Sequence, residues 1–178
     1  MIFNLRLLFF LSIVSISAHA FQLPKNIQKK VEKEVKLAFD IESFTMEFIK
    51  VSKEINVQLV TKITKNNFTK ILKKEVVIGY LFADKAPSKT DQFDYLVLFD
   101  KDLNIIKSKV LIYREDYGGE ISSKRWLRQF EGKNSKDQLK YEEDIIAISG
   151  ATISAKSMTI AINNLLKTVN LLQENNYF

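Results

Sequence analysis

The stretch Ile148-Ser149-Gly150-Ala151-Thr152-Ile153-Ser154 decides how the rest of the chain is organised. It joins a region rich in β-branched and aromatic residues to a long apolar repeat. Glycine lets another molecule approach the backbone closely, and a helix N-terminus offers unpaired N–H groups and a positive dipole end. The stretch is therefore either an ordinary hydroxyl cap, which is the commoner feature, or a phosphate site.

The residues after this stretch predict a long helix, because apolar side chains recur every three or four positions from Ala155 to Leu172. We expect the face that they form to pack against the core. The repeating positions are Ala155, Met158, Ile162, Leu165, Val169 and Leu172.

The residues before the stretch predict an antiparallel sheet, because short apolar runs are separated by short turns. Gly79 lies inside one run, which indicates a bulge or close packing against a neighbour. The loop at 86–90 and the tight turn at 100–102 separate three of the strands. The expected strands are 68–73, 75–84, 93–99 and 104–113.

The N-terminal part of the mature chain adds a helix and a strand. Residues 26–39 carry one apolar stripe among lysines and glutamates, and residues 44–51 alternate as a strand does. Residues 52–63 fit either a short helix or a strand. The predicted fold class is α+β, with an antiparallel β-sheet packed by an N-terminal helix and a long C-terminal helix.

The first residues predict a secretory signal peptide. A short charged segment is followed by the apolar run 7–17 and by the small-x-small site Ala18-His19-Ala20. A transmembrane anchor is the alternative, but a span needs roughly 20 apolar residues. We therefore expect cleavage near Ala20, a mature chain that starts at Phe21, and a periplasmic or secreted protein. The expected divisions are 1–20 signal peptide, 21–67 N-terminal helix and strand extension, and 68–178 main domain.

Composition narrows the chemistry that the mature chain can perform. The chain has no cysteine, and its one histidine, His19, leaves with the signal peptide. Nucleophilic triads, His/Cys zinc sites, His-bound haem and disulfides are thereby excluded. Redox chemistry would require a bound cofactor. The net charge is +6, but the lysines are scattered, so we expect no nucleic-acid partner.

The block 114–133 differs in character from the strands before it. The pair Gly118-Gly119 can form a tight turn or let the backbone approach a ligand. Ser122 or Ser123 can cap a short helix whose apolar face holds Trp126, Leu127 and Phe130.

The tetrapeptide Ser149-Gly150-Ala151-Thr152 resembles the flavinylation signature of FMN-binding domains. Such domains occur in the C and G subunits of Na+-translocating quinone reductase and Rnf-type complexes, and in small secreted relatives. The similarity covers roughly residues 68 to 172. Besides the signature, it rests on the order of Val77-Ile78-Gly79-Tyr80, an aspartate-bearing hairpin, Tyr113-Arg114-Glu115, Gly118-Gly119-Glu120 and Gln129-Phe130-x-Gly132-Lys133.

The resemblance implies that FMN is attached through its phosphate to the hydroxyl of Thr152. A separate magnesium-dependent flavin transferase, which uses FAD, makes this phosphodiester bond in the family. In one respect the chain departs from the family: the aspartate usual three residues before the serine is Ile146, and the nearest acid is Asp144. The residues expected to line the phosphate are Ser149, Gly150, Ala151 and Ser154.

The resemblance also points to residues around the isoalloxazine ring. Trp126 is alternatively a core residue, and Arg114-Glu115 a surface pair. The candidates are Arg114, Glu115, Gly118, Gly119 and Trp126, with no catalytic residue and no metal ligand among them.

Three functions follow from the resemblance. The first is an exported electron-transfer protein that carries FMN and exchanges electrons with a membrane or periplasmic redox partner. The second is a non-covalent FMN-binding or assembly module without redox turnover of its own, which Ile146 favours. The third, a flavin reductase, lacks support because no Gly-x-Gly-x-x-Gly element is present.

Overall fold

The computed structural model describes residues 25–178, so the predicted signal peptide and the expected mature start at Phe21 lie outside the described residues. Five strands form one antiparallel sheet in the order β1-β2-β3-β4-β5. This arrangement confirms the predicted α+β class. The strands are β1 (Thr45–Phe48), β2 (Phe68–Lys73), β3 (Val76–Pro87), β4 (Gln92–Asp100) and β5 (Ile105–Ile112).

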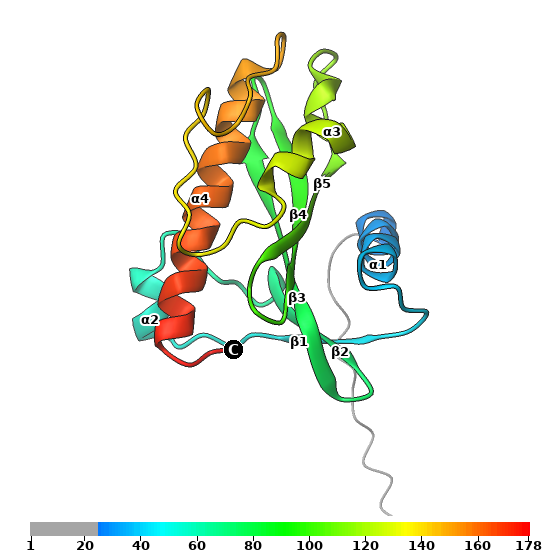
Figure 1. Cartoon of the computed structure of the whole chain (residues 1–178), viewed down its shortest axis with the longest axis vertical. Coiled ribbons are helices and arrows are strands. Elements are labelled where there is room, and N and C mark those ends of the chain that lie inside the picture. Colours follow the sequence, from blue (N-terminus) through cyan, green and yellow to red (C-terminus); the bar gives the residue numbers. More distant parts are fainter. Residues whose placement is uncertain (1–24) are drawn as a thin grey trace, which may run out of the picture.

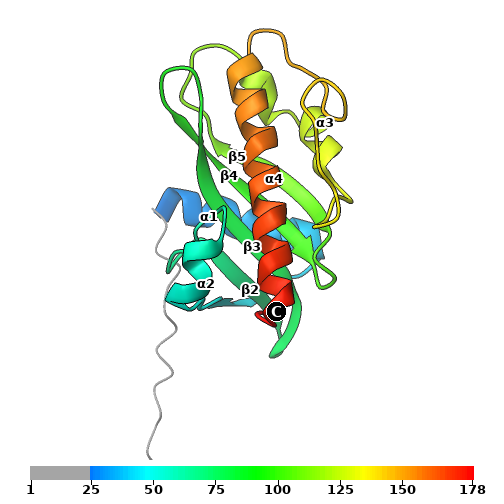
Figure 2. The same cartoon turned by 90° about the vertical axis from the view of Figure 1, so that its left-hand side faces the viewer.

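The helices divide between the two faces of the sheet (Figures 1 and 2). Helix α1 (Lys25–Phe39) covers one face, and the long helix α4 (Thr152–Glu174) runs along the other. Short α2 (Lys53–Gln58) lies beside the C-terminal half of α4. The segment after β5 forms η1 (Gly119–Ser122), α3 (Lys124–Leu127) and η2 (Arg128–Phe130).

Two cores result, because successive strand residues point to opposite faces. On the α1 side the core is aliphatic, with Ile27, Val31 and Val35 packed on the sheet. On the α4 side it is rich in aromatic rings, including Phe68, Phe82, Phe93, Tyr95, Phe99 and Phe130. All six repeating positions predicted for the C-terminal helix are fully buried in this second core.

Most predicted elements are confirmed, with shifted ends. The C-terminal helix begins at Thr152, and residues 53–58 are a helix that Ser52 caps by accepting a hydrogen bond from the Ile55 N–H. The predicted loop 86–90 was wrong at its start: Ala86 and Pro87 remain in β3, paired with β4. Proline is tolerated there because this part of β3 is an edge.

That edge arises because β2 pairs with β3 only as far as Phe82. Beyond it, the Ala83 N–H donates to the carbonyl of Asn67, and residues 84–87 have β4 as their one strand neighbour. Gly79 was predicted to mark either a bulge or close packing, and both are found. A bulge opposite Ile71 and Leu72 adjoins it, and a Cβ on Gly79 would lie 2.5 Å from the Phe39 ring of α1.

Candidate functional site

The N-terminus of α4 carries no side-chain cap. Its N-cap residue is Ala151, so the hydroxyl cap predicted as one interpretation is wrong. The first intrahelical hydrogen bond runs from the Ala155 N–H to the Ala151 carbonyl. Within the described part of the chain, the N–H groups of Thr152, Ile153 and Ser154 therefore have no protein acceptor. Free donors at a positive dipole end suit a phosphate group.

The residues around this helix end leave room for a ligand. Ser149, Gly150 and Thr152 are all exposed. Gly150 has a φ of 79°, in the left-handed region, and a Cβ added there would meet no atom within 4 Å. The first turn holds no acidic residue, whereas it does contain exposed Lys156. The local charge is thus positive, which favours an anion.

Gly118, in the block 114–133, packs directly against the signature. It adopts a φ of 78°, and a Cβ on it would lie 2.7 Å from the Ala151 Cβ and 2.8 Å from the Gly150 carbonyl oxygen. Only glycine allows so close an approach with this backbone conformation. Gly119 differs, since a Cβ there would meet nothing within 4 Å. The structure thus joins Gly118 to the signature through tight packing and leaves Gly119 free of it.

Ser154 is buried beneath the helix end rather than exposed at it. Its side chain is 2% exposed, and its hydroxyl shares a hydrogen bond of 3.1 Å with the Tyr113 hydroxyl, directly after β5. This bond ties the first turn of α4 to the sheet. A role for Ser154 in lining the phosphate stays a prediction.

Trp126 lies in the core, at 6% exposure, with its ring edge-to-face against Phe130. Its indole N–H donates to the Ile146 carbonyl at 2.7 Å. Gln129 accepts from the Ile146 N–H at 2.8 Å.

Asp144, the acid nearest to the signature, accepts from the Lys140 N–H in the preceding turn. Asp144 also donates its own N–H to the Lys140 carbonyl, so this acid is bonded within the turn that precedes the signature.

Arg114 is directed toward β4. Its guanidinium pairs with the Asp94 carboxylate and donates to the Gln92 carbonyl at 2.7 Å. Both contacts brace the end of the β3–β4 hairpin. The pairing identifies a structural partner for Arg114, and contact with an isoalloxazine ring stays a prediction.

Glu115 holds the tip of the same hairpin. Its carboxylate accepts from the Thr90 N–H at 2.7 Å, the Thr90 hydroxyl at 2.8 Å and the Asp91 N–H at 3.2 Å. The nearby Ser88 hydroxyl and these donors lower the pKa of Glu115 to about 2. Thr90 and Asp91 donate directly to the carboxylate, whereas the Ser88 hydroxyl makes no hydrogen bond in the described structure.

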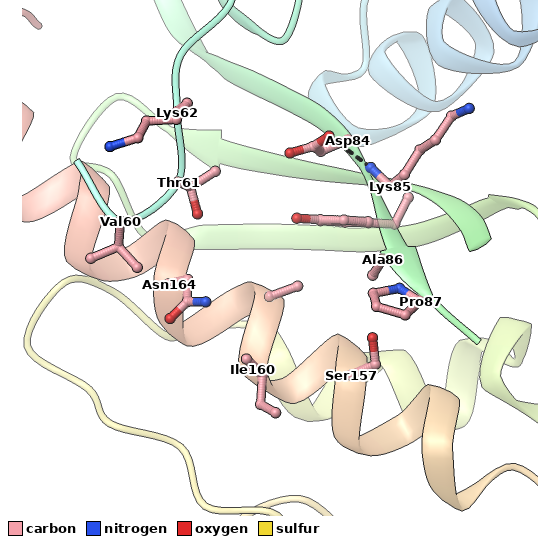
Figure 3. Close-up of a pocket in the computed structure, with 12 residues that line it drawn as sticks. Val60, Thr61, Lys62, Asp84, Lys85, Ala86, Pro87, Ser157, Ile160 and Asn164 are labelled. Carbon is pink, nitrogen blue, oxygen red and sulfur yellow. Dashed lines mark hydrogen bonds between the residues drawn. The ribbon is translucent and has the colours of Figure 1, made fainter. Parts of the chain in front are cut away.

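A hollow of about 430 Å³ lies elsewhere, between the free edge of β3, the middle of α4 and residues 60–62 (Figure 3). It contains Asp84, which accepts from the Lys85 N–H at 2.8 Å, and the buried Ser157 hydroxyl, which has no partner in the described structure. Burial raises the pKa of Asp84. Burial, and then the charge of Asp84, raise the pKa of Tyr95.

The chemistry of this hollow differs from that of the signature. The Lys62 ammonium donates to the carbonyls of Val57 and Leu59, and the Lys85 ammonium points away (Figure 3). The hollow therefore holds a half-buried carboxylate, that of Asp84, which the signature lacks. Sequence reasoning missed Asp84 and Ser157, because nothing in the local pattern indicates that α4 and β3 leave space there.

Among residues 25–178, no group of His, Cys, Asp and Glu side chains is arranged to hold a metal ion. None of the helices there combines the length and the apolar character that a membrane span needs.

The fold and site together define a small α+β domain in which the long C-terminal helix begins without a side-chain cap. Residues 89–167 match the sequence model of the FMN-binding domain family. This segment runs from the β3–β4 turn into α4 and includes the whole signature. The chain therefore contains an FMN-binding domain, and FMN is its cofactor. No curated protein matches the chain.

Proposed function

We propose that this chain is an exported electron-transfer flavoprotein that carries FMN covalently on Thr152. The observation that carries the proposal is an exposed threonine hydroxyl at the first position of a helix whose leading N–H groups lack protein acceptors. Those N–H groups would hold the phosphate, and Lys156 adds positive charge beside them. FMN supplies the redox chemistry when bound.

Attachment requires only one group from this chain. The Thr152 oxygen forms a bond to the FMN-side phosphorus of FAD, the pyrophosphate bond breaks, AMP leaves, and the hydroxyl proton is released to solvent. The transferase and magnesium would supply the remaining chemistry. The part of this chain is to present the hydroxyl, and the openness around Gly150 leaves space for the transferase to reach it.

The test is the intact mass of the chain after incubation with a flavin transferase, FAD and Mg²⁺. We expect a mass increase equal to FMN minus water, and a yellow colour that survives denaturation. Thr152→Ala should lose both, whereas Thr152→Ser, which keeps a hydroxyl, should retain them. An unmodified wild-type chain in this assay would contradict covalent attachment.

A specific observation favours a second candidate, a non-covalent FMN-binding or assembly module. Ile146 occupies the position where the resemblance expects an aspartate, and its side chain is 71% exposed. A transferase that requires that carboxylate would not modify this chain. FMN that co-purifies but separates from the chain on denaturation would support this candidate.

The partners and location belong to the same proposal. The predicted signal peptide supports export, and a covalent tether suits a compartment where a dissociated flavin would be lost. We propose a membrane or periplasmic redox protein as electron partner. Reversible reduction of the purified flavoprotein, followed by electron transfer to a membrane fraction of the same cells, tests this assignment.

A further inference from the structure

The peptide of Ile146 is held from both sides by one short helical segment. Its carbonyl accepts from the Trp126 indole at 2.7 Å, and its N–H donates to the Gln129 side-chain oxygen at 2.8 Å. The Gln129 amide nitrogen donates in turn to the Trp126 carbonyl at 2.9 Å. We call this arrangement of Trp126 and Gln129 around Ile146 the backbone clamp.

The clamp is anchored in the core. Trp126 is 6% exposed and Phe130 is fully buried, and their rings pack edge-to-face with centroids 5.3 Å apart. The Ser123 hydroxyl caps the helix turn that carries Trp126. A clamp built on buried, capped residues has little freedom to move, so it can define the position of the loop bound to it.

The loop is also fixed at its other end. Ile148 is largely buried and accepts from the Ala151 N–H at 3.2 Å, and Gly118 packs against Ala151. The next residue is Thr152. The main chain is therefore fixed by hydrogen bonds at Ile146, by a turn at Ile148 and by packing at Ala151. The backbone position of Thr152 is thereby defined.

Ile146 takes part through its main chain alone. Its side chain is 71% exposed, although it is large and apolar. Both clamp bonds use its backbone N–H and carbonyl, which every residue except proline provides. The position of the loop therefore does not depend on which side chain stands at 146.

We propose that Trp126 and Gln129 are positioning residues for flavin attachment, which act by holding the Ile146 peptide so that the signature loop presents Thr152 to the transferase. This inference rests on the proposed function. In this proposal Trp126 acts by holding the backbone and not by stacking on the flavin ring. The loop keeps its shape although Ile146 stands where the family has an aspartate. Positioning of a reacting group by about 1 Å changes rates by large factors.

The experiment measures FMN transfer from FAD to the full mature chain by a purified flavin transferase with Mg²⁺. Gln129→Leu removes the acceptor for the Ile146 N–H, and Trp126→Phe removes the indole donor but keeps a ring against Phe130. We expect kcat to fall about tenfold or more in the double variant, with little change in the KM for FAD. Gln129→Glu keeps the acceptor for the Ile146 N–H but loses the donor to the Trp126 carbonyl, so its kcat should lie between those of Gln129→Leu and the wild type.

Hydrogen exchange gives an independent readout. The Ile146 amide should exchange much faster in Gln129→Leu than in the wild type, whereas the amides of the α4 interior should not change. A purely structural role would instead lower the melting temperature and leave the kcat of the folded fraction unchanged, and that result would overturn the inference. Absence of transfer to the wild-type chain would contradict the proposed function itself, since every variant would then read zero.

Discussion

Two regions flank the N-terminal half of α4, and they differ in charge more than in shape. The signature at Ser149–Thr152 is an open surface with free N–H donors and a lysine nearby. The hollow beside β3 has a volume of about 430 Å³ and contains the half-buried carboxylate of Asp84. Unpaired N–H donors at a positive helix end favour a phosphate, whereas a carboxylate disfavours one.

The hollow and the predicted phosphate site are different places in this domain. The hollow is the more visible feature, yet none of the four signature residues lines it. The case for the signature rests on unpaired N–H donors, exposure and close backbone packing. Substitutions at Gly118, Asp84 and Glu115 test the contrast, in order of decreasing expected effect.

Gly118→Ala should damage the signature region most. The new Cβ would meet Ala151 and the Gly150 carbonyl, and alanine would have to adopt a φ of 78°. We expect a loss of about 2–4 kcal/mol of unfolding free energy and poor FMN attachment. Urea unfolding and the intact-mass assay measure the two effects.

Gly119→Ala is the matched control, because a Cβ there meets nothing within 4 Å. Its change in unfolding free energy should stay within about 0.5 kcal/mol. Equal effects of the two substitutions would show that Gly118 does not support the signature loop.

Asp84→Asn tests the charge of the hollow. Because burial raises the pKa of Asp84 above 3.8, its ionisation destabilises the fold, and stability falls as pH rises through the folded pKa. Asparagine can still accept from the Lys85 N–H, so we expect higher stability at neutral pH, by less than about 1 kcal/mol after solvent screening. The gain should vanish at acidic pH in thermal melts.

The same variant should take up FMN on Thr152 at the wild-type rate. Slower attachment in Asp84→Asn would join the hollow to the flavin site and would remove the contrast between the two regions. Asp84→Ala, which also loses the hydrogen bond to Lys85, separates the effect of charge from that of the hydrogen bond.

Glu115→Gln should have the smallest effect. The pKa of Glu115 lies at about 2, below its ordinary 4.5, so the ionised carboxylate contributes stability above pH 4.5 that is lost as pH falls toward 2. Glutamine keeps one acceptor for the Thr90 donors but has no charge to lose. We expect a flatter dependence of melting temperature on pH across that window, and an unchanged slope would contradict this role.

Local sequence patterns predicted the architecture well. The helix at 152–174 follows from its three- and four-residue spacing, and the hairpins follow from apolar runs with short turns, since both depend on neighbours in the chain. Ser123 as cap of the short helix is confirmed for the same reason. The loop at 86–90 began too early in the prediction, because pairing with β4 keeps Pro87 in the strand.

The candidate site was only partly predictable. The FMN-binding domain and its cofactor were identified from the order of motifs, and the family match over 89–167 confirms them. The partners of Arg114, Glu115 and Trp126 were not predictable. Their hydrogen-bond partners Asp94, Thr90 and Ile146 lie 20 or more residues away in the chain, so no local pattern encodes these bonds.

The sequence by itself therefore determined the class of domain, the strand and helix content and the signature with its threonine. Only the tertiary structure decided that the helix end has no cap, that Gly118 packs on Ala151, and that Trp126 and Gln129 hold Ile146. The physical reason is the distance along the chain between the residues that interact. Helical and strand periodicity is set by neighbours a few residues apart, whereas the shape of a site depends on which distant side chains the packed core brings together.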